Sequence, residues 1–162
     1  MLYLAIDGTG VPMRPSEAAG RAGNGPDGRA HTREVKLAAL FTQTGCDGQG
    51  RSVRDPHSST HLACVDPAER FGGLVAAEAR RRGADHVRQL VVLGDGAPWI
   101  WKLATTRFPE ATQIVDLYHA REHLHDLADH LAFIVSDPAA WRTERLAALD
   151  AGDIEAISRA AC

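Results

Sequence analysis

Leu90-Val91-Val92-Leu93-Gly94-Asp95-Gly96 is the stretch that carries most information about the fold. A short, continuous apolar run of this kind predicts a strand buried inside a sheet. The run ends in an aspartate next to glycines, a combination that favours turns. Leu2-Tyr3-Leu4-Ala5-Ile6-Asp7-Gly8 repeats this pattern at the start of the chain. The sequence therefore predicts two inner strands, each followed by an acidic turn.

The order of the other elements predicts a mixed α/β fold. Further strands are expected in three segments: 34–43, 60–65 and 112–117. Helices are expected at 67–82, 97–107, 118–135 and 139–149, with a short one after 152. Asp66 is the expected N-cap of the first helix and Gly83 its stop, whereas residues 15–33 are expected to form a loop. A three-strand antiparallel meander, a helix and then β-α-β-α form the layout of an RNase H-like mixed sheet.

Asp7 and Asp95 are the candidate catalytic residues. In an RNase H-like sheet the first and fourth strands are neighbours, so the ends of these strands bring both carboxylates together. Two close carboxylates repel each other, and a divalent cation that prefers oxygen ligands, Mg²⁺ or Mn²⁺, removes that repulsion. Such a site supports in-line phosphoryl transfer. The alternative is that both Asp-Gly pairs only form turns. Asp116 is expected beside the two acids, as the N-cap of the next helix, or in both roles.

The net charge of −3 counts against a chain that binds DNA strongly by itself, because phosphate contacts normally need a basic surface. Basic residues gather in two places, which a solvated surface explains equally well: Arg14, Arg21, Arg29, His31 and Arg33 in the loop, and Arg80, Arg81 and Arg82 on a helix. No apolar run is long enough to span a membrane, and a cytoplasmic protein is expected. The separated cysteines, Cys46, Cys64 and Cys162, predict reduced thiols.

A second candidate site lies on the helix that begins at Tyr118. His119-Ala120-Arg121-Glu122-His123 matches the His-x-x-Glu-His pattern of inverzincin metallopeptidases. In those enzymes the histidines bind zinc and the glutamate is the general base. Glu144 and Glu155 are the only downstream candidates for a third ligand. Ordinary surface or supporting histidines are the alternative interpretation.

Trp99 and Trp101 follow Asp95 closely and are candidates to line a substrate cleft. With Arg14 and Arg33 they form the set of candidate DNA contacts. The alternative is that both rings pack a helix against the sheet.

Four longer stretches are specific enough to compare with known families: Leu4–Met13 (LAIDGTGVPM), Thr32–Lys36 (TREVK), Val92–Trp101 (VLGDGAPWIW) and Ile114–His123 (IVDLYHAREH). Together they resemble the ISKra-type insertion-sequence transposases, which are relatives of the Mutator-like group. The similarity extends over nearly the whole chain.

The resemblance implies an RNase H-like fold and an Asp-Asp-Glu triad that uses Mg²⁺ to cleave DNA strands and to join them at transposon ends. It assigns Asp7 as the first acid and Asp95 as the second. It also matches Asp116 and His119 to an Asp-x-x-His signature, as supporting residues. The implied partners are transposon and target DNA, together with a second copy of the chain or a full-length transposase.

Two features expected of this family do not occur in the 162 residues. One is the third acid, which the family carries in a Val-Glu-Ala-Gly-Cys-Lys-like stretch, and the other is an amino-terminal DNA-binding region. We therefore expect residues 1–135 to form a partial catalytic core and residues 136–162 to begin an all-α insertion, in an inactive fragment. The zinc peptidase stays open as an alternative, as does a non-catalytic remnant that binds DNA or a full-length transposase.

Overall fold

The computed structural model describes residues 1–23, 25, 27–28 and 30–160. Arg29 and Cys162, which the sequence analysis names, lie outside these residues. The chain divides into two compact units, one ending at Ile114 and the other beginning at Val115. The sequence predicts a boundary at 135–136 and so groups the helix after residue 116 with the sheet, whereas the structure groups it with the helices that follow it.

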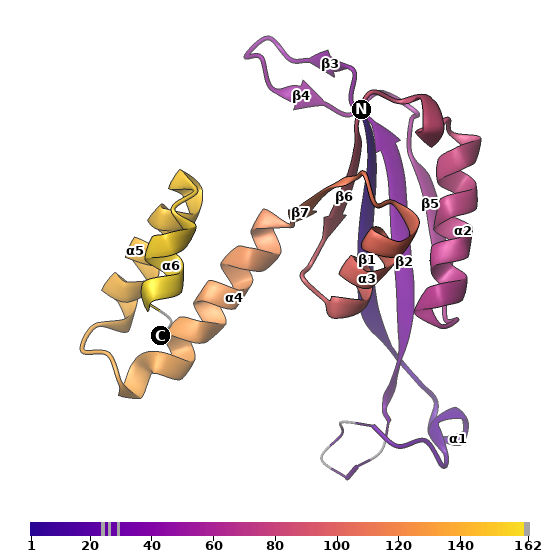
Figure 1. The fold of residues 1–162 in the computed structure, drawn as a ribbon. Helices are drawn as coiled ribbons and strands as arrows, with labels where there is room; N and C mark the ends of the chain where they lie inside the picture. Colours follow the sequence, from indigo (N-terminus) through magenta and orange to yellow (C-terminus); the bar gives the residue numbers. More distant parts are fainter. Residues whose placement is uncertain (24, 26, 29, 161–162) are drawn as a thin grey trace. The chain divides into compact units, whose positions relative to one another are not determined.

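The first unit is built around a mixed sheet of five strands (Figure 1). The strands are β1 (Leu2–Pro12), β2 (Thr32–Thr42), β5 (Thr60–Cys64), β6 (Leu90–Gly94) and β7 (Thr112–Val115). Their order across the sheet is β5-β2-β1-β6-β7; β2 is antiparallel to β1 and β5, and β6 is parallel to β1. The predicted α/β class, the antiparallel meander and the pairing of the first and fourth strands are confirmed. β3 (Gly45–Cys46) and β4 (Ser52–Val53) form a separate small hairpin.

β1 is longer than the sequence predicted, and this changes the setting of Asp7. The acidic turn expected at Asp7 is wrong, because the strand continues to Pro12. Residues of β2 pair with this whole extension, beginning with Leu37 opposite Asp7. The ladder hydrogen bonds satisfy the backbone there, so the two glycines of the extension do not end the strand. Beyond it, a short helix, α1 (Pro15–Ala18), lies within the segment expected to be a loop.

Two helices cover one face of the sheet: α2 (Ala68–Arg81) and α3 (Pro98–Arg107). Successive side chains of a strand point to opposite faces, and alternate residues of β1 supply the core. Leu2, Leu4 and Ile6 are buried and pack in one cluster with Phe71 of α2 and Ile100 of α3. The helix-covered face of the sheet is therefore identified by Leu2, Leu4 and Ile6.

The two ends of α2 correct one prediction and confirm another. Asp66 is not the N-cap: Pro67 takes that position and no side chain caps the helix. Asp66 instead forms an ion pair with Arg70 at 3.5 Å, one helical turn along the chain. At the other end the helix stops at Gly83, as predicted, with a φ of +78° that glycine adopts without steric cost. A 3₁₀ turn, η1 (Ala84–His86), follows.

The second unit consists of helices. They are α4 (Leu117–His130), the 3₁₀ turn η2 (Leu131–Phe133), α5 (Pro138–Ala151) and α6 (Ile154–Ala160). Within this unit α4 packs against α5, and α5 packs against α6. Asp116 caps α4 and Asp137 caps α5, because each carboxylate accepts hydrogen bonds from the first turn of its helix. The capping role predicted for Asp116 is confirmed. Among the described residues, no helix is long and apolar enough to cross a membrane.

Candidate functional site

Asp7 lies on β1, and Asp95 directly follows β6, the parallel neighbour of β1 in the sheet. Ile6 and Gly94 are the last residues that pair in the β1–β6 ladder. Asp7 and Asp95 are therefore the next residues along two strands that run about 4.8 Å apart. Asp7 is within the longer β1, whereas Asp95 follows the end of β6. The adjacency predicted for these two strands is confirmed by this register.

Each of the two carboxylates holds a backbone N–H with one oxygen. Gly8 N donates to Asp7 Oδ1 at 2.7 Å, and Ala97 N donates to Asp95 Oδ1 at 2.7 Å. The second of these bonds closes a turn that leads from β6 into α3, so Asp95 does have the turn-forming role considered for it. Within the described part of the chain, Oδ2 of Asp7 and Oδ2 of Asp95 accept no hydrogen bond. One oxygen of each acid is thus available to a cation or a substrate.

The pair supplies part of the ligand set that Mg²⁺ or Mn²⁺ prefers. Both ions take oxygen ligands, and Mg²⁺ commonly binds through one or two carboxylates while water and substrate phosphates complete its shell. In the described residues, no group of three or more His, Cys, Asp or Glu side chains is placed to hold a metal ion. An ion held by Asp7 and Asp95 would need phosphate oxygens and water to complete its shell, and metal binding here stays a prediction.

On the face of β1 opposite to that of Asp7, Gly8 lies beside a cluster formed by Glu34, Lys36 and Trp99. The sequence had predicted no role for Glu34 and Lys36. Lys36 is only 7% exposed. It donates to Glu34 Oε2 at 2.5 Å, and its Nζ lies 5.4 Å from the centre of the Trp99 ring. A Cβ at Gly8 would lie 2.8 Å from Glu34 Oε1 and 3.3 Å from Trp99. The spacing of Glu34 and Lys36 could have indicated this ion pair, since residues i and i+2 share one face of a strand.

Trp99 and Trp101 lie on the helix-covered side of the sheet, and Asp7 points to the other side. Trp99 meets Phe71 edge-on with 6.2 Å between ring centres. Trp101 approaches the position that a Cβ of Gly94 would occupy to 3.3 Å. Both rings pack α3 against the core, which is the alternative that the sequence analysis gave. Contact of either ring with DNA stays a prediction.

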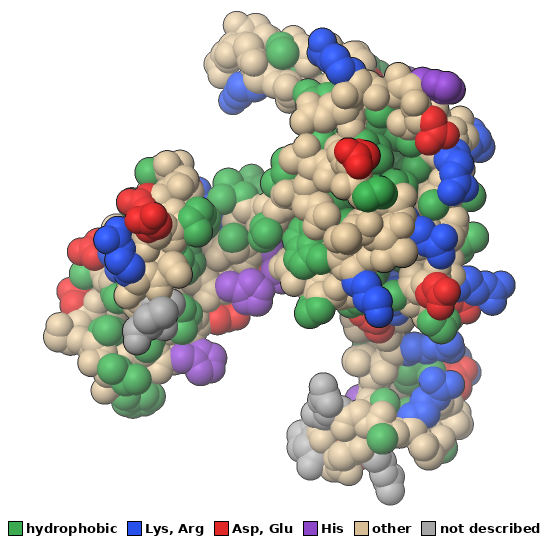
Figure 2. Space-filling model, in the orientation of Figure 1, with side chains coloured by type: hydrophobic (Ala, Val, Ile, Leu, Met, Phe, Trp, Pro, Cys, Tyr) green, Lys and Arg blue, Asp and Glu red, His purple; other side chains and the backbone are tan. Residues whose placement is uncertain are grey.

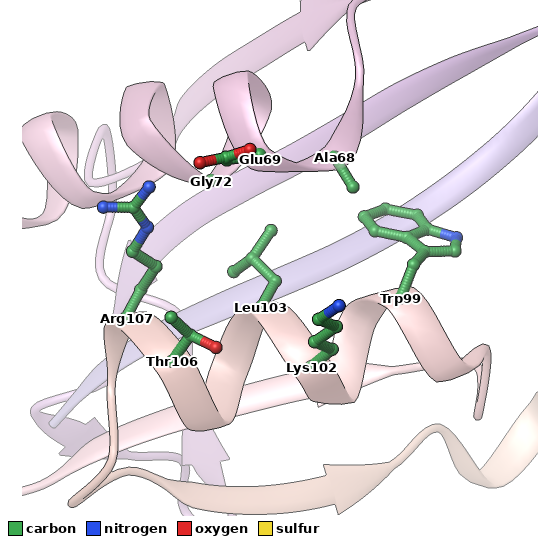
Figure 3. Close-up of a pocket in the computed structure, with 8 residues that line it drawn as sticks. All are labelled: Ala68, Glu69, Gly72, Trp99, Lys102, Leu103, Thr106 and Arg107. Carbon is green, nitrogen blue, oxygen red and sulfur yellow. The ribbon is translucent and has the colours of Figure 1, made fainter.

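Trp99 also borders a cleft of about 380 Å³ between α2 and α3 (Figure 3). Figure 3 shows Leu103 rising from α3 toward α2 in the middle of the cleft. The two helices approach closely at Gly72, where a Cβ would lie 3.1 Å from Leu103. The charged residues of the lining are Glu69, Lys102 and Arg107. Because the cleft opens on the helix side, it does not include Asp7.

Asp116 and His119 belong to the second unit, at the first turn of α4. Asp116 Oδ1 accepts hydrogen bonds from Tyr118 N at 2.8 Å and from His119 N at 3.2 Å. The Asp116 carboxylate therefore holds the helix start that carries His119. Their role beside Asp7 and Asp95 stays a prediction.

The residues of the zinc-peptidase pattern do come together on α4. The rings of His119 and His123 meet edge-on with 4.8 Å between centres, and His119 Nδ1 lies 3.5 Å from Glu122 Oε2. No third ligand accompanies this pair in the described part of the chain. The two glutamates considered for that role form ion pairs elsewhere, Glu144 with Arg145 and Glu155 with Arg159.

Arg14 and Arg33 lie at the end of the β1–β2 ladder that is farthest from the rest of the sheet. Arg33 is opposite Val11 in that ladder, and Arg14 occupies the N-cap position of α1. Arg14 is exposed and Arg33 is half-buried. Neither guanidinium forms an ion pair with a described residue. Contact of Arg14 and Arg33 with DNA stays a prediction.

Comparison with protein families, with curated proteins and with solved structures found no match to this chain.

Proposed function

We propose that the sheet-containing unit is part of the catalytic core of a DNA transposase of the acidic-triad type, with an RNase H-like fold. The observation that carries the proposal is the register of β1 and β6, in which Asp7 and Asp95 follow the last paired residues of adjacent strands. The strand order β5-β2-β1-β6-β7 supports the RNase H-like interpretation. The resemblance of four sequence stretches to ISKra-type transposases supports DNA at transposon ends as the substrate.

In this proposal Asp7 and Asp95 hold a divalent cation through their available oxygens. Mg²⁺ bound there supplies activation of a water or a 3′-hydroxyl and stabilisation of the leaving oxygen. The protein's own contribution is orientation, because the N–H groups of Gly8 and Ala97 each hold one carboxylate oxygen. The ladder between the two strands maintains the spacing of the acids before substrate binds, which reduces the reorganisation needed for reaction.

The resemblance assigns its third acid to none of the 162 residues. Asp116 and His119 enter the proposal as supporting residues only. Metal binding, rather than strand transfer, is therefore the property on which this chain is best tested.

Binding of Mn²⁺ to the full chain, followed through the electron paramagnetic resonance signal of the free ion, tests the proposal. We expect Asp7→Asn and Asp95→Asn each to weaken binding by at least about tenfold. Asp85→Asn is the matched control, since it removes the same charge from an exposed residue of η1. Unchanged Mn²⁺ affinity in both site variants would defeat the metal site. Tight zinc binding that is lost in His119→Ala would favour the peptidase.

A further inference from the structure

The β1–β2 ladder continues beyond the rest of the sheet as a two-stranded ribbon. β6 pairs with β1 only as far as Ile6, and β5 pairs with β2 only from Lys36 onward. The two strands of the ribbon stay paired to the end of their ladder. We define the ribbon as residues 8–12 and 32–35; it projects from the sheet toward α1 (Figure 1). It begins directly after Asp7.

One face of the ribbon continues the face of the sheet to which Asp7 points. Because side chains alternate along a strand, Asp7, Thr9 and Val11 point the same way. Opposite residues of an antiparallel ladder share a face, which adds Val35 and Arg33. Val11 is four residues from Asp7, so its partner Arg33 lies about 13 Å from Asp7 at a rise of about 3.3 Å per residue.

The ribbon and its tip are basic in a chain that is acidic overall. Residues 8–35 contain four Lys or Arg and three Asp or Glu, a net charge of +1, whereas the whole chain has a net charge of −3. On the opposite face of the ribbon, Glu34 is neutralised by Lys36 at 2.5 Å. Arg33 has no ionic partner among the described residues. Figure 2 shows basic side chains over the end of the ribbon near α1.

We propose that the Asp7 face of the ribbon binds the phosphate backbone of duplex DNA, with Arg33 as the main contact. This inference rests on the proposed function, which makes DNA the substrate at Asp7. Phosphates follow one another along each strand of a duplex, so Arg33 holds the strand within a few nucleotides of the phosphodiester at Asp7. The guanidinium fork matches phosphate oxygens, and the exposed Thr9 hydroxyl is a further donor between the two positions.

Fluorescence anisotropy of a short labelled duplex, with the full chain in EDTA at low salt, tests this contact apart from metal binding. We expect Arg33→Ala to weaken DNA binding about fivefold to tenfold and to lower the slope of log K against log salt concentration by about one. Arg33→Lys should keep the slope, because the charge is retained. Arg88→Ala is the matched control: it removes the same charge from an exposed residue before β6, at the other end of the sheet, and should leave binding unchanged.

A second pair of variants separates the two faces of the ribbon without touching Arg33. Thr9→Glu puts a negative charge on the Asp7 face, and Thr32→Glu puts the same charge on the opposite face; both positions are exposed. We expect Thr9→Glu to weaken binding clearly more than Thr32→Glu, with circular dichroism confirming that both variants fold.

The outcomes distinguish this inference from the proposed function. Equal DNA affinity of Arg33→Ala and Arg88→Ala, or no DNA binding by the wild-type chain, would overturn the ribbon contact, while Mn²⁺ binding at Asp7 and Asp95 would still support the proposed function. The expected Arg33 effect without any Mn²⁺ site at Asp7 would support the ribbon as a DNA-binding surface and remove the metal-dependent function.

Discussion

Gly94 approaches Ile100 so closely that the residue before Asp95 has no room for a side chain. A Cβ at Gly94 would lie 2.8 Å from Ile100 Cγ2, and Ile100 is fully buried against the sheet. The end of β6 is thus held directly against α3. The position of Asp95 depends on this contact, because Asp95 is the next residue and its carboxylate begins the turn into α3.

The first prediction follows from this close approach. Gly94→Ala should destabilise the fold by about 1–3 kcal/mol, because the added methyl group overpacks a rigid part of the core. Gly73→Ala, in the interior of α2, is the control: nothing lies within 4 Å of its Cβ position, and alanine should stabilise a helix by up to about 1 kcal/mol. Urea unfolding followed by circular dichroism measures both changes. Equal stability of Gly94→Ala and wild type would contradict the packing described.

The second prediction concerns the ion pair beside Gly8. The Lys36 side chain is 9% exposed and that of Glu34 is 47% exposed. Glu34→Gln leaves a buried ammonium without its charged partner and should cost about 1–2 kcal/mol, less than a fully buried pair because Glu34 reaches solvent. Lys36→Met keeps the apolar stem and removes the charge, so it should cost less. In a double-mutant cycle measured by urea unfolding, Glu34→Gln should cost no stability when it is combined with Lys36→Met. An equal loss of unfolding free energy in both backgrounds would argue against the ion pair.

The third prediction is a pH dependence at Asp55, which ties the end of β2 to the segment after β4. Thr42 Oγ1 donates to Asp55 Oδ2 at 2.6 Å, while Thr44 donates to Oδ1 from its backbone N at 3.0 Å and from Oγ1 at 2.8 Å. These hydrogen bonds, that of the Thr42 hydroxyl first, hold the pKa of Asp55 below its ordinary value. A lowered folded-state pKa adds stability above the unfolded-state value of about 3.9, and that stability is lost as the pH falls through the folded-state pKa.

Asp55→Asn should therefore lower the thermal unfolding temperature at neutral pH, and the difference from wild type should shrink below about pH 4. Asp85→Asn, an exposed aspartate whose side chain accepts no hydrogen bond within the described residues, controls for the loss of one negative charge. Thermal unfolding of the three proteins across this pH range measures the effect. If the difference in unfolding temperature between Asp55→Asn and wild type does not change with pH, the carboxylate charge contributes nothing to the stability of the fold.

Local signals predicted the elements that depend on a few neighbouring residues. The apolar run Leu90–Gly94 is β6, Gly83 ends α2, and Asp116 caps α4. Each of these outcomes follows from burial or from hydrogen bonds within one or two turns of chain. The same kind of local signal predicted Asp66 as the N-cap of α2, and this prediction was wrong. Pro67 occupies the cap position, and the Asp66 carboxylate pairs with Arg70 instead.

The setting of the candidate site could be predicted only in part. Two acids on adjacent strands were expected, and the register of β1 with β6 agrees with that expectation. The turn expected at Asp7 did not occur, because pairing with β2 outweighs the turn preference of Asp-Gly. The buried Lys36 and the side of the sheet on which Trp99 lies were not foreseen, since both depend on α3 packing against β1 and β2.

The sequence by itself determined most of the longer strands and helices, because the spacing of apolar residues and the helix stops are local properties of the chain. Only the tertiary structure decided the register between strands, and with it the neighbours of Asp7. That register places Asp95 on the adjacent strand, Arg33 farther along the same face and Trp99 on the other side. The physical reason is that ladder hydrogen bonds and core packing join residues far apart in the sequence, and a shift of one residue would exchange the two faces of the strand.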